Sequence, residues 1–103
     1  RSEDPARALD YLGRAAALET RGTRHRFVYA IALHDLGQPR KALVELNRLN
    51  RLFPSDEQVL LALANYSAEL GEWSQARSHA DKLDKLAPQN PNYQQLQQSF
   101  QGK

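Results

Sequence analysis

The chain of 103 residues contains no cysteine, so it has no disulfide framework and no thiolate for catalysis or metal binding. It also contains no methionine, even at its first position, which indicates a segment of a longer protein. Its longest apolar runs, Phe27 to Leu33 and Val59 to Ala64, fall far short of the roughly 18 residues that a spanning helix needs. The sequence therefore predicts no membrane contact, and it leaves the compartment open between cytoplasm and periplasm.

The residues that are present belong to an ordinary folded protein. Hydrophobic residues make up 41% of the chain and charged residues 25%, which is unlike the composition of disordered proteins. The net charge of +2 is too small to point to a nucleic acid or any other class of partner. At this length we expect one modest hydrophobic core.

Identical residues recur along the chain at one fixed separation. Pro54 and Pro88 are one such pair. The other pairs that show this interval are Leu36-Gly37 with Leu70-Gly71, Ala42 with Ala76, Leu49 with Leu83, and Leu52 with Leu86. A partial earlier copy places Ala8 before Ala42 and Leu12 before Leu46 in the same register. Internal periods of this length are typical of stacked structural repeats.

Each copy has the pattern of a helical hairpin. Apolar residues recur at steps of three and four, which is helical spacing, and no segment has the alternation of a strand. Gly37 and Gly71 follow apolar helix ends, where a left-handed residue ends a helix, and Ser55 with Gln58 has the spacing of a capping box. The predicted helices cover residues 5–19, 23–36, 39–53, 56–70, 73–87 and 91–101.

These features resemble the tetratricopeptide repeat, in which an aromatic residue, Leu-Gly and Tyr mark the first helix, Ala and Phe mark the second, and Pro follows. The corresponding residues are Arg26, Tyr29, Ala30, Leu33, Ala42, Leu46 and Pro54 in one copy, and Leu60, Leu63, Ala64, Ser67, Ala76, Ala80 and Pro88 in the next. Arg26 and Ser67 depart from the pattern. The resemblance implies an all-α fold, a right-handed superhelix of antiparallel helix hairpins (an α-solenoid) with about six helices.

The domain prediction is a single repeat domain over residues 1–103. It consists of the second helix of a truncated repeat (5–19), two full repeats (23–56 and 57–90) and a polar-faced capping helix (91–101). We expect these to be the C-terminal repeats of a larger bacterial protein. Because the truncated repeat leaves one face of helix 5–19 uncovered, self-association through that helix is also expected.

The resemblance implies that the first helix of each repeat lines a concave surface that binds a protein or peptide. The residues predicted to face a partner are Arg24, Phe27, Ile31, His34 and Asp35 on the first such helix, and Gln58, Leu61, Asn65 and Glu69 on the second. Apolar anchors beside an amide suit a bound peptide. In the alternative interpretation, Phe27, Ile31 and Leu61 only pack against neighbouring helices. These apolar residues, with Ala62, also occupy the polar positions of the family's carboxylate-binding members, so that specificity is not expected.

The sequence predicts no enzyme, small-molecule substrate, cofactor or metal site. It contains no phosphate-binding glycine loop and no nucleophile elbow. His25, His34 and His79 lack the spacing of a zinc site and have no cysteine companion.

The sequence is also compatible with two other functions. Helical repeats of slightly longer period bind RNA, but the basic residues here are scattered and the repeats are too few for a useful footprint. Alternatively, the chain is a purely structural C-terminal cap. Residues 27–37 and 60–63 look like the closing repeats of large proteins that carry an upstream multihaem cytochrome, which would make the module periplasmic.

Overall fold

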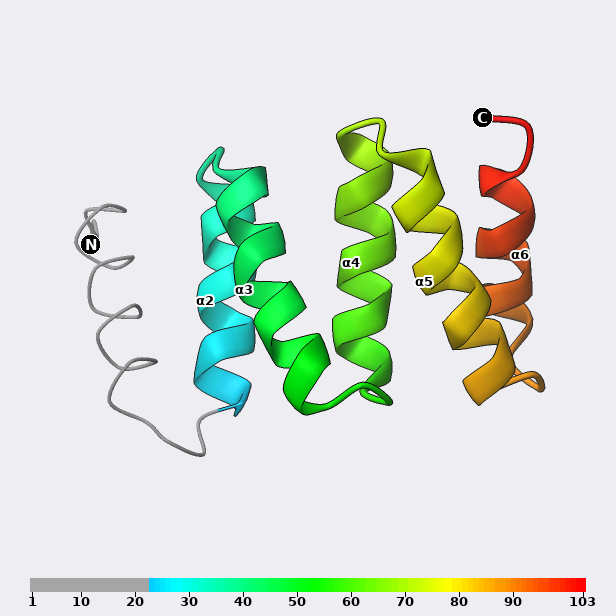
Figure 1. Ribbon diagram of the computed structural model, residues 1–103, viewed down its shortest axis with the longest axis horizontal. Helices are drawn as coiled ribbons and strands as arrows, with labels where there is room; N and C mark the ends of the chain where they lie inside the picture. The colour runs from blue at the N-terminus through cyan, green and yellow to red at the C-terminus, as the bar shows by residue number, and fades with distance from the viewer. Residues whose placement is uncertain (1–22) are drawn as a thin grey trace, which may run out of the picture. The chain divides into compact units, whose positions relative to one another are not determined.

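A computed structural model of the chain describes residues 23–103, and all regular structure in that range is helical (Figure 1). The helices are α2 (Thr23–Asp35), α3 (Pro39–Leu52), α4 (Glu57–Glu69), α5 (Trp73–Leu86) and α6 (Pro91–Phe100). Their bounds differ from the predicted ones by no more than one residue at either end. The all-helical prediction is therefore confirmed for this range, whereas the predicted helix 5–19 lies outside the described residues.

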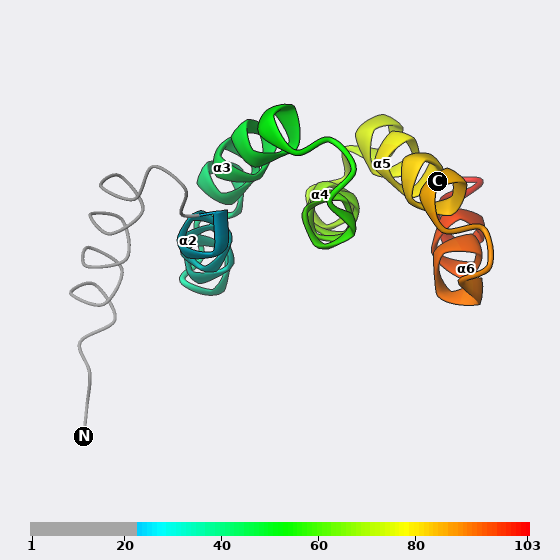
Figure 2. The ribbon, with the colours of Figure 1, turned by 90° about the horizontal axis from the view of Figure 1, so that it is seen from below.

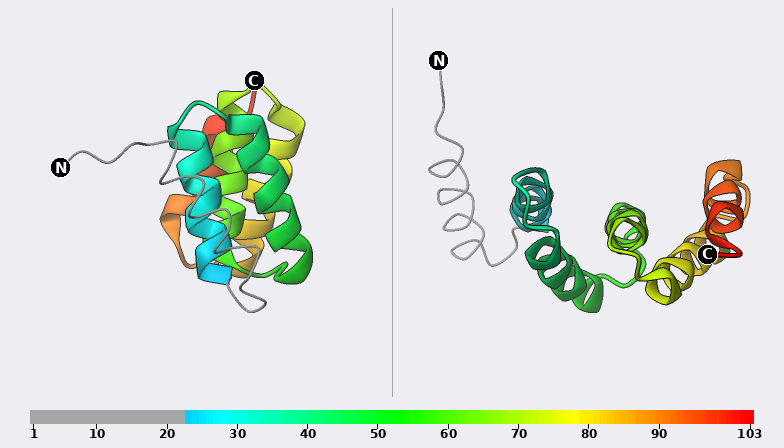
Figure 3. Two further views of the ribbon diagram at one scale, coloured as in Figure 1. Left: turned by 90° about the vertical axis from the view of Figure 1, so that its left-hand side faces the viewer. Right: turned by 90° about the horizontal axis from the view of Figure 1, so that it is seen from above.

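The chain divides into two compact units, the first ending at Leu49 and the second beginning at Asn50. The described part of the first unit contains α2 and most of α3. In the second unit, α5 packs against both α4 and α6. Figure 2 and the right-hand view of Figure 3 show α4 and α6 on the same side of α5.

The two hairpin turns, after α2 and after α4, have the same hydrogen bonds in the register of the sequence repeat. Gly37 donates to the His34 carbonyl at 3.0 Å, and Gln38 donates to the Leu33 carbonyl at 2.8 Å. In the next copy, Gly71 donates to Ala68 at 3.0 Å, and the following residue donates to Ser67 at 2.9 Å. This is the Schellman motif, which requires a left-handed residue, and both glycines have positive φ. The repeat period seen in the sequence is thus a repeat of backbone structure.

Replacing Gly37 with alanine is expected to lower the free energy of unfolding by about 1 to 2 kcal/mol, because its φ of +83° crowds a Cβ against its own backbone. Beyond its own residue and its two chain neighbours, a Cβ at this position would have no heavy atom within 4 Å, so the cost comes from the local backbone alone. Urea denaturation measures the loss. Gly37→Asn should cost less, since asparagine tolerates this region; equal losses for the two variants would contradict this explanation.

Two helices of the second unit, α4 and α6, each begin with a capping side chain. Asp56 is the N-cap of α4, and its carboxylate accepts from the backbone amides of Gln58 at 3.0 Å and Val59 at 3.3 Å. Asn90 caps α6 in the same way, accepting from the amide of Asn92 at 2.9 Å. The prediction of a capping box begun by Ser55 was wrong by one residue, because the carboxylate of Asp56 is the group that satisfies the free amides.

The core consists of leucines with alanines where helices meet. In the first unit the buried residues are Ala30, Leu33, Ala42, Leu43, Leu46 and Leu49. In the second they are Val59, Leu60, Leu63, Ala64, Tyr66, Ser67, Ala76, Ala80, Leu83, Ala87 and Phe100. Ala64, Ala76 and Ala80 form one cluster with Phe100, and Trp73 packs against this cluster with its ring centroid 5.8 Å from that of Phe100. The aromatic side chain of Phe100 therefore packs α6 against the rest of the second unit.

Candidate functional site

The five predicted partner-facing residues of the first unit lie on α2 and share one face of that helix. Arg24 and Asp35 are exposed, while Phe27, Ile31 and His34 are half-buried. The imidazole Nδ1 of His34 lies 3.2 Å from the carboxylate Oδ1 of Asp35. This face therefore combines two partly accessible apolar side chains with a polar pair at the end of the helix.

The four predicted residues of the second unit lie on α4 in the same register. Gln58 and Glu69 are exposed, and Leu61 and Asn65 are half-buried. Ala68, the counterpart of His34, instead packs against the cluster around Phe100. The face of α4 thus keeps one apolar side chain and an amide partly accessible. At position 68, however, it has an alanine where α2 has the polar His34.

The capping helix α6 is joined to α4 at its beginning. The hydroxyl of Tyr93 donates to the Glu57 carboxylate Oε1 at 2.9 Å, and this bond raises the pKa of Tyr93. Asn92, Gln95 and Ser99 are all exposed on α6. A hydrogen bond from Gln97 to Asp81 at 3.1 Å also joins α6 to α5. Polar contacts therefore hold α6 to both of the other helices of its unit.

The described residues 23–103 contain no cluster of metal-binding side chains. No group of three or more histidine, aspartate or glutamate side chains in this range could hold a metal ion. What the exposed helix faces can offer a partner is apolar contact, amide hydrogen bonds and charge.

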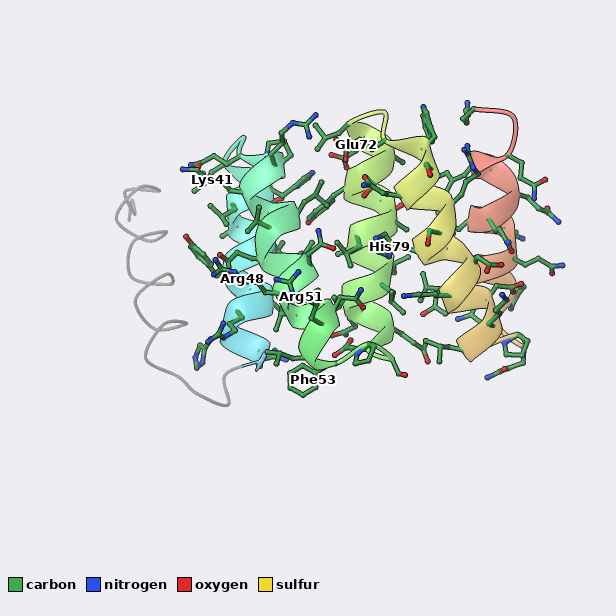
Figure 4. The ribbon with its side chains drawn as sticks, in the orientation of Figure 1. Lys41, Arg48, Arg51, Phe53, Glu72 and His79 are labelled. Carbon is green, nitrogen blue, oxygen red and sulfur yellow. The ribbon has the colours of Figure 1, made fainter. Side chains whose placement is uncertain are left out.

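His79, near the middle of α5, has a buried ring nitrogen without a hydrogen-bond partner among the described residues (Figure 4). Partial burial, and secondarily the positive charge of Lys82, lower the pKa of His79 below its usual 6.5. Both causes favour the neutral imidazole. The fold therefore accommodates His79 better without its second proton.

Acidification is expected to destabilise the protein through His79. Because the pKa is lower in the folded chain, the unfolded chain binds the proton more readily. The stability contributed by neutral His79 is present above about pH 6.5 and is lost as the pH falls through the folded-state pKa. Thermal unfolding from neutral to mildly acidic pH should show a smaller fall in Tm for His79→Gln than for the wild type. Identical falls would assign the pH dependence to other groups.

A further exposed surface, on α3, was not among the predicted sites. It contains the labelled side chains Lys41, Arg48 and Arg51 (Figure 4), with Val44 between them in the sequence. All four are exposed, and Arg48 Nη1 lies 3.5 Å from the Glu45 carboxylate. Counting charge helix by helix, instead of over the whole chain, is the signal that would have found it.

Comparison with known protein families gives a match over much of the chain. A family model described as "Tetratricopeptide repeat" matches residues 1–66, which is more than half of the chain. A search of curated proteins yields no match. In the described range no helix has both the length and the apolar character needed to cross a membrane.

Proposed function

Because the chain belongs to the tetratricopeptide repeat family, we propose that it is a protein-interaction module that binds a peptide or protein partner on the concave face of its repeats. Repeats of this family generally mediate protein–protein interactions and are typically non-catalytic. The proposed domain is the one expected from the sequence, with repeats at 23–56 and 57–90 and a cap at 91–101.

The observation that carries this proposal is a shared pattern of exposure on α2 and α4. The paired positions are 24 with 58, 27 with 61, 31 with 65 and 35 with 69, and all eight residues are exposed or half-buried. On the same helices Ala30 and Ala64, which are paired in the same register, are fully buried. Both first helices thus bury one face and leave the same other face accessible.

The chemistry of these faces suits a peptide. Phe27, Ile31 and Leu61 offer apolar contact while remaining partly accessible, so an apolar side chain of a partner would gain from burial against them. Asn65 can both donate to and accept from a peptide backbone. Arg24 on α2 and Glu69 on α4 add exposed charges of opposite sign to these faces.

Site-specific photo-crosslinking tests the proposal. A photoreactive amino acid at position 31 or 61 should capture a partner protein from a lysate of the source cells in a discrete adduct. The same group at Gln75, an exposed residue of α5, is the matched control and should capture none. Equal capture from all three positions, or none from positions 31 and 61, would contradict binding through α2 and α4.

A second role, as a stabilising end of a larger protein, is favoured by the packing of α6. Phe100 is buried against the alanine cluster and against Trp73, so α6 covers apolar surface that would otherwise meet water. Deletion of residues 91–103 distinguishes the two roles. A lower Tm with unchanged crosslinking at position 61 would make α6 a stabiliser, whereas loss of crosslinking in a deletion variant that still folds would include α6 in the binding surface.

A further inference from the structure

Positive charge is concentrated on α3. Four cations, Arg40, Lys41, Arg48 and Arg51, and one acid, Glu45, give this helix a net charge of +3, while the whole chain carries +2. The rest of the chain is therefore slightly acidic. A mild overall charge conceals one strongly basic helix.

The four cations lie on one face of α3. At 100° per residue, Arg40, Lys41, Arg48 and Arg51 all fall within about 60° of Val44 around the helix axis. All five side chains are exposed, and Val44 is 52% exposed. Glu45 lies outside this arc, about 100° from Val44, where it is half-buried and paired with Arg48. We refer to Arg40, Lys41, Val44, Arg48 and Arg51 as the basic face of α3.

The fold does not require this charge, as the equivalent helix α5 demonstrates. The residues one repeat after the basic face are Ser74, Gln75, Ser78, Lys82 and Lys85. On α5, Lys85 is paired with Asp81 at 3.0 Å. Both helices bury the same side, through Ala42 and Leu49 in α3 and through Ala76 and Leu83 in α5. Two helices with the same packing thus differ in their outward charge.

The cations at the start of α3 are also placed against its dipole. The first turn of the helix contains Arg40 and Lys41 and no acid. The positive end of a helix dipole lies there, and it favours anions over cations. An acidic partner would relieve both this opposition and the mutual repulsion of the four cations.

We propose that the basic face of α3 binds an acidic protein segment, whose carboxylates pair with Lys41, Arg48 and Arg51 around an apolar side chain that contacts Val44. This surface shares no residue with the proposed partner-binding faces of α2 and α4. Its test therefore succeeds or fails independently of the proposed function.

The composition of the face favours a protein over the other polyanions. An apolar centre with a charged rim is the usual anatomy of a protein interface, and a phosphate backbone offers nothing to Val44. The face has no aromatic side chain on which a single-stranded base could stack. A helix that lies on a membrane presents a wide apolar face to the lipid, whereas Ala42, Leu43, Leu46 and Leu49 of α3 are buried in the core.

A synthetic acidic helix is the probe for this proposal. It is a fluorescent, amidated peptide with glutamates flanking a row of leucines, titrated into the full chain and followed by anisotropy. Binding should weaken as salt rises from low to physiological concentration. The double variant K41E/R48E should bind about tenfold or more weakly, because attraction becomes repulsion at two positions. The control K82E/K85E changes the net charge by the same amount on α5, and its affinity should stay within about twofold of the wild type.

A second variant separates a protein ligand from other polyanions. Val44→Ser introduces the residue that α5 has at the equivalent position, so the fold should tolerate it, and an unchanged Tm checks this. It should weaken the peptide and leave any binding of polyuridylate unchanged. The proposal is overturned if the peptide fails to bind, or if both double variants weaken it equally. It is also overturned if polyuridylate, or vesicles of equal parts phosphatidylserine and phosphatidylcholine, bind more tightly than the peptide with the same dependence on Lys41 and Arg48.

Discussion

Replacing Phe100 with alanine is expected to lower the free energy of unfolding by about 3 to 5 kcal/mol, the usual cost of truncating a buried phenylalanine. The ring is only 6% exposed and packs on the alanine cluster of α4 and α5. Alanines have no flexible side chains that could move into the cavity, so any relaxation would come from Trp73 and Leu96, which pack against the same cluster. A domain of ordinary stability would lose a large part of its total by this one change.

Urea denaturation followed by circular dichroism measures the effect of Phe100→Ala. Gln98→Ala is the control, because Gln98 is an exposed residue of the same helix and should change stability by less than about 0.5 kcal/mol. Phe100→Leu should lie between the two, since it keeps much of the apolar volume. If Phe100→Ala cost no more than the control, α6 would not be part of the cooperative fold.

Replacing Ala64 with leucine is expected to lower the free energy of unfolding by about 1 to 3 kcal/mol, through overpacking instead of a cavity. Ala64 is fully buried on α4, in one cluster with Ala76 and Ala80 of α5. Small side chains allow the two backbones to approach closely, and three added carbon atoms would force them apart. The free energy of unfolding is therefore expected to fall, although leucine is more hydrophobic than alanine.

The control for Ala64→Leu is Ala62→Leu, which makes the same chemical change two residues earlier on α4. Ala62 is half-buried, so the added side chain can extend toward solvent and should change stability by less than about 0.5 kcal/mol. Thermal unfolding of both variants provides the comparison. A stabilised Ala64→Leu would show that the helices have room at this position and that its small side chain is not a packing requirement.

The hairpins could be predicted from the sequence because their signals are local and repeated. Gly37 and Gly71 indicate helix ends by their chemistry alone, and the structure gives both a positive φ. Ala64 and Ala76 could be assigned to helix contacts because they recur in register with Ala30 and Ala42. One signal of this kind is weak, but the same signal at the equivalent position of the next repeat makes it strong.

The N-cap of α4 could not be assigned from spacing alone. Ser55 and Asp56 are adjacent, and both residue types favour helix N-termini. Which of them caps depends on the backbone between Phe53 and Asp56, where the amide of Asp56 donates to the Phe53 carbonyl at 3.1 Å. That turn makes Asp56 the last residue before the helix. A difference of one residue here is set by turn geometry, which composition does not encode.

The basic face of α3 was missed for a different reason. In the sequence, Arg40, Lys41, Arg48 and Arg51 are interrupted by apolar residues and stand among cations of other segments, so the basic residues look scattered. Only a helix with known bounds brings them to one side, and only known burial places Val44 between them at the surface. A charged face is therefore harder to recognise from the sequence than an apolar face, because it requires the helix bounds and the burial of each residue.

The final helix is secured near both of its ends. Tyr93, in its first turn, is bonded to Glu57 of α4, and Phe100, its last residue, is buried beside Trp73 of α5. A helix held at one end alone would unzip gradually from its loose tip. With attachments at opposite ends, and to two different neighbours, α6 has no loose tip from which unzipping can start. It should therefore detach in a single all-or-none step, exposing the apolar surface beneath it all at once.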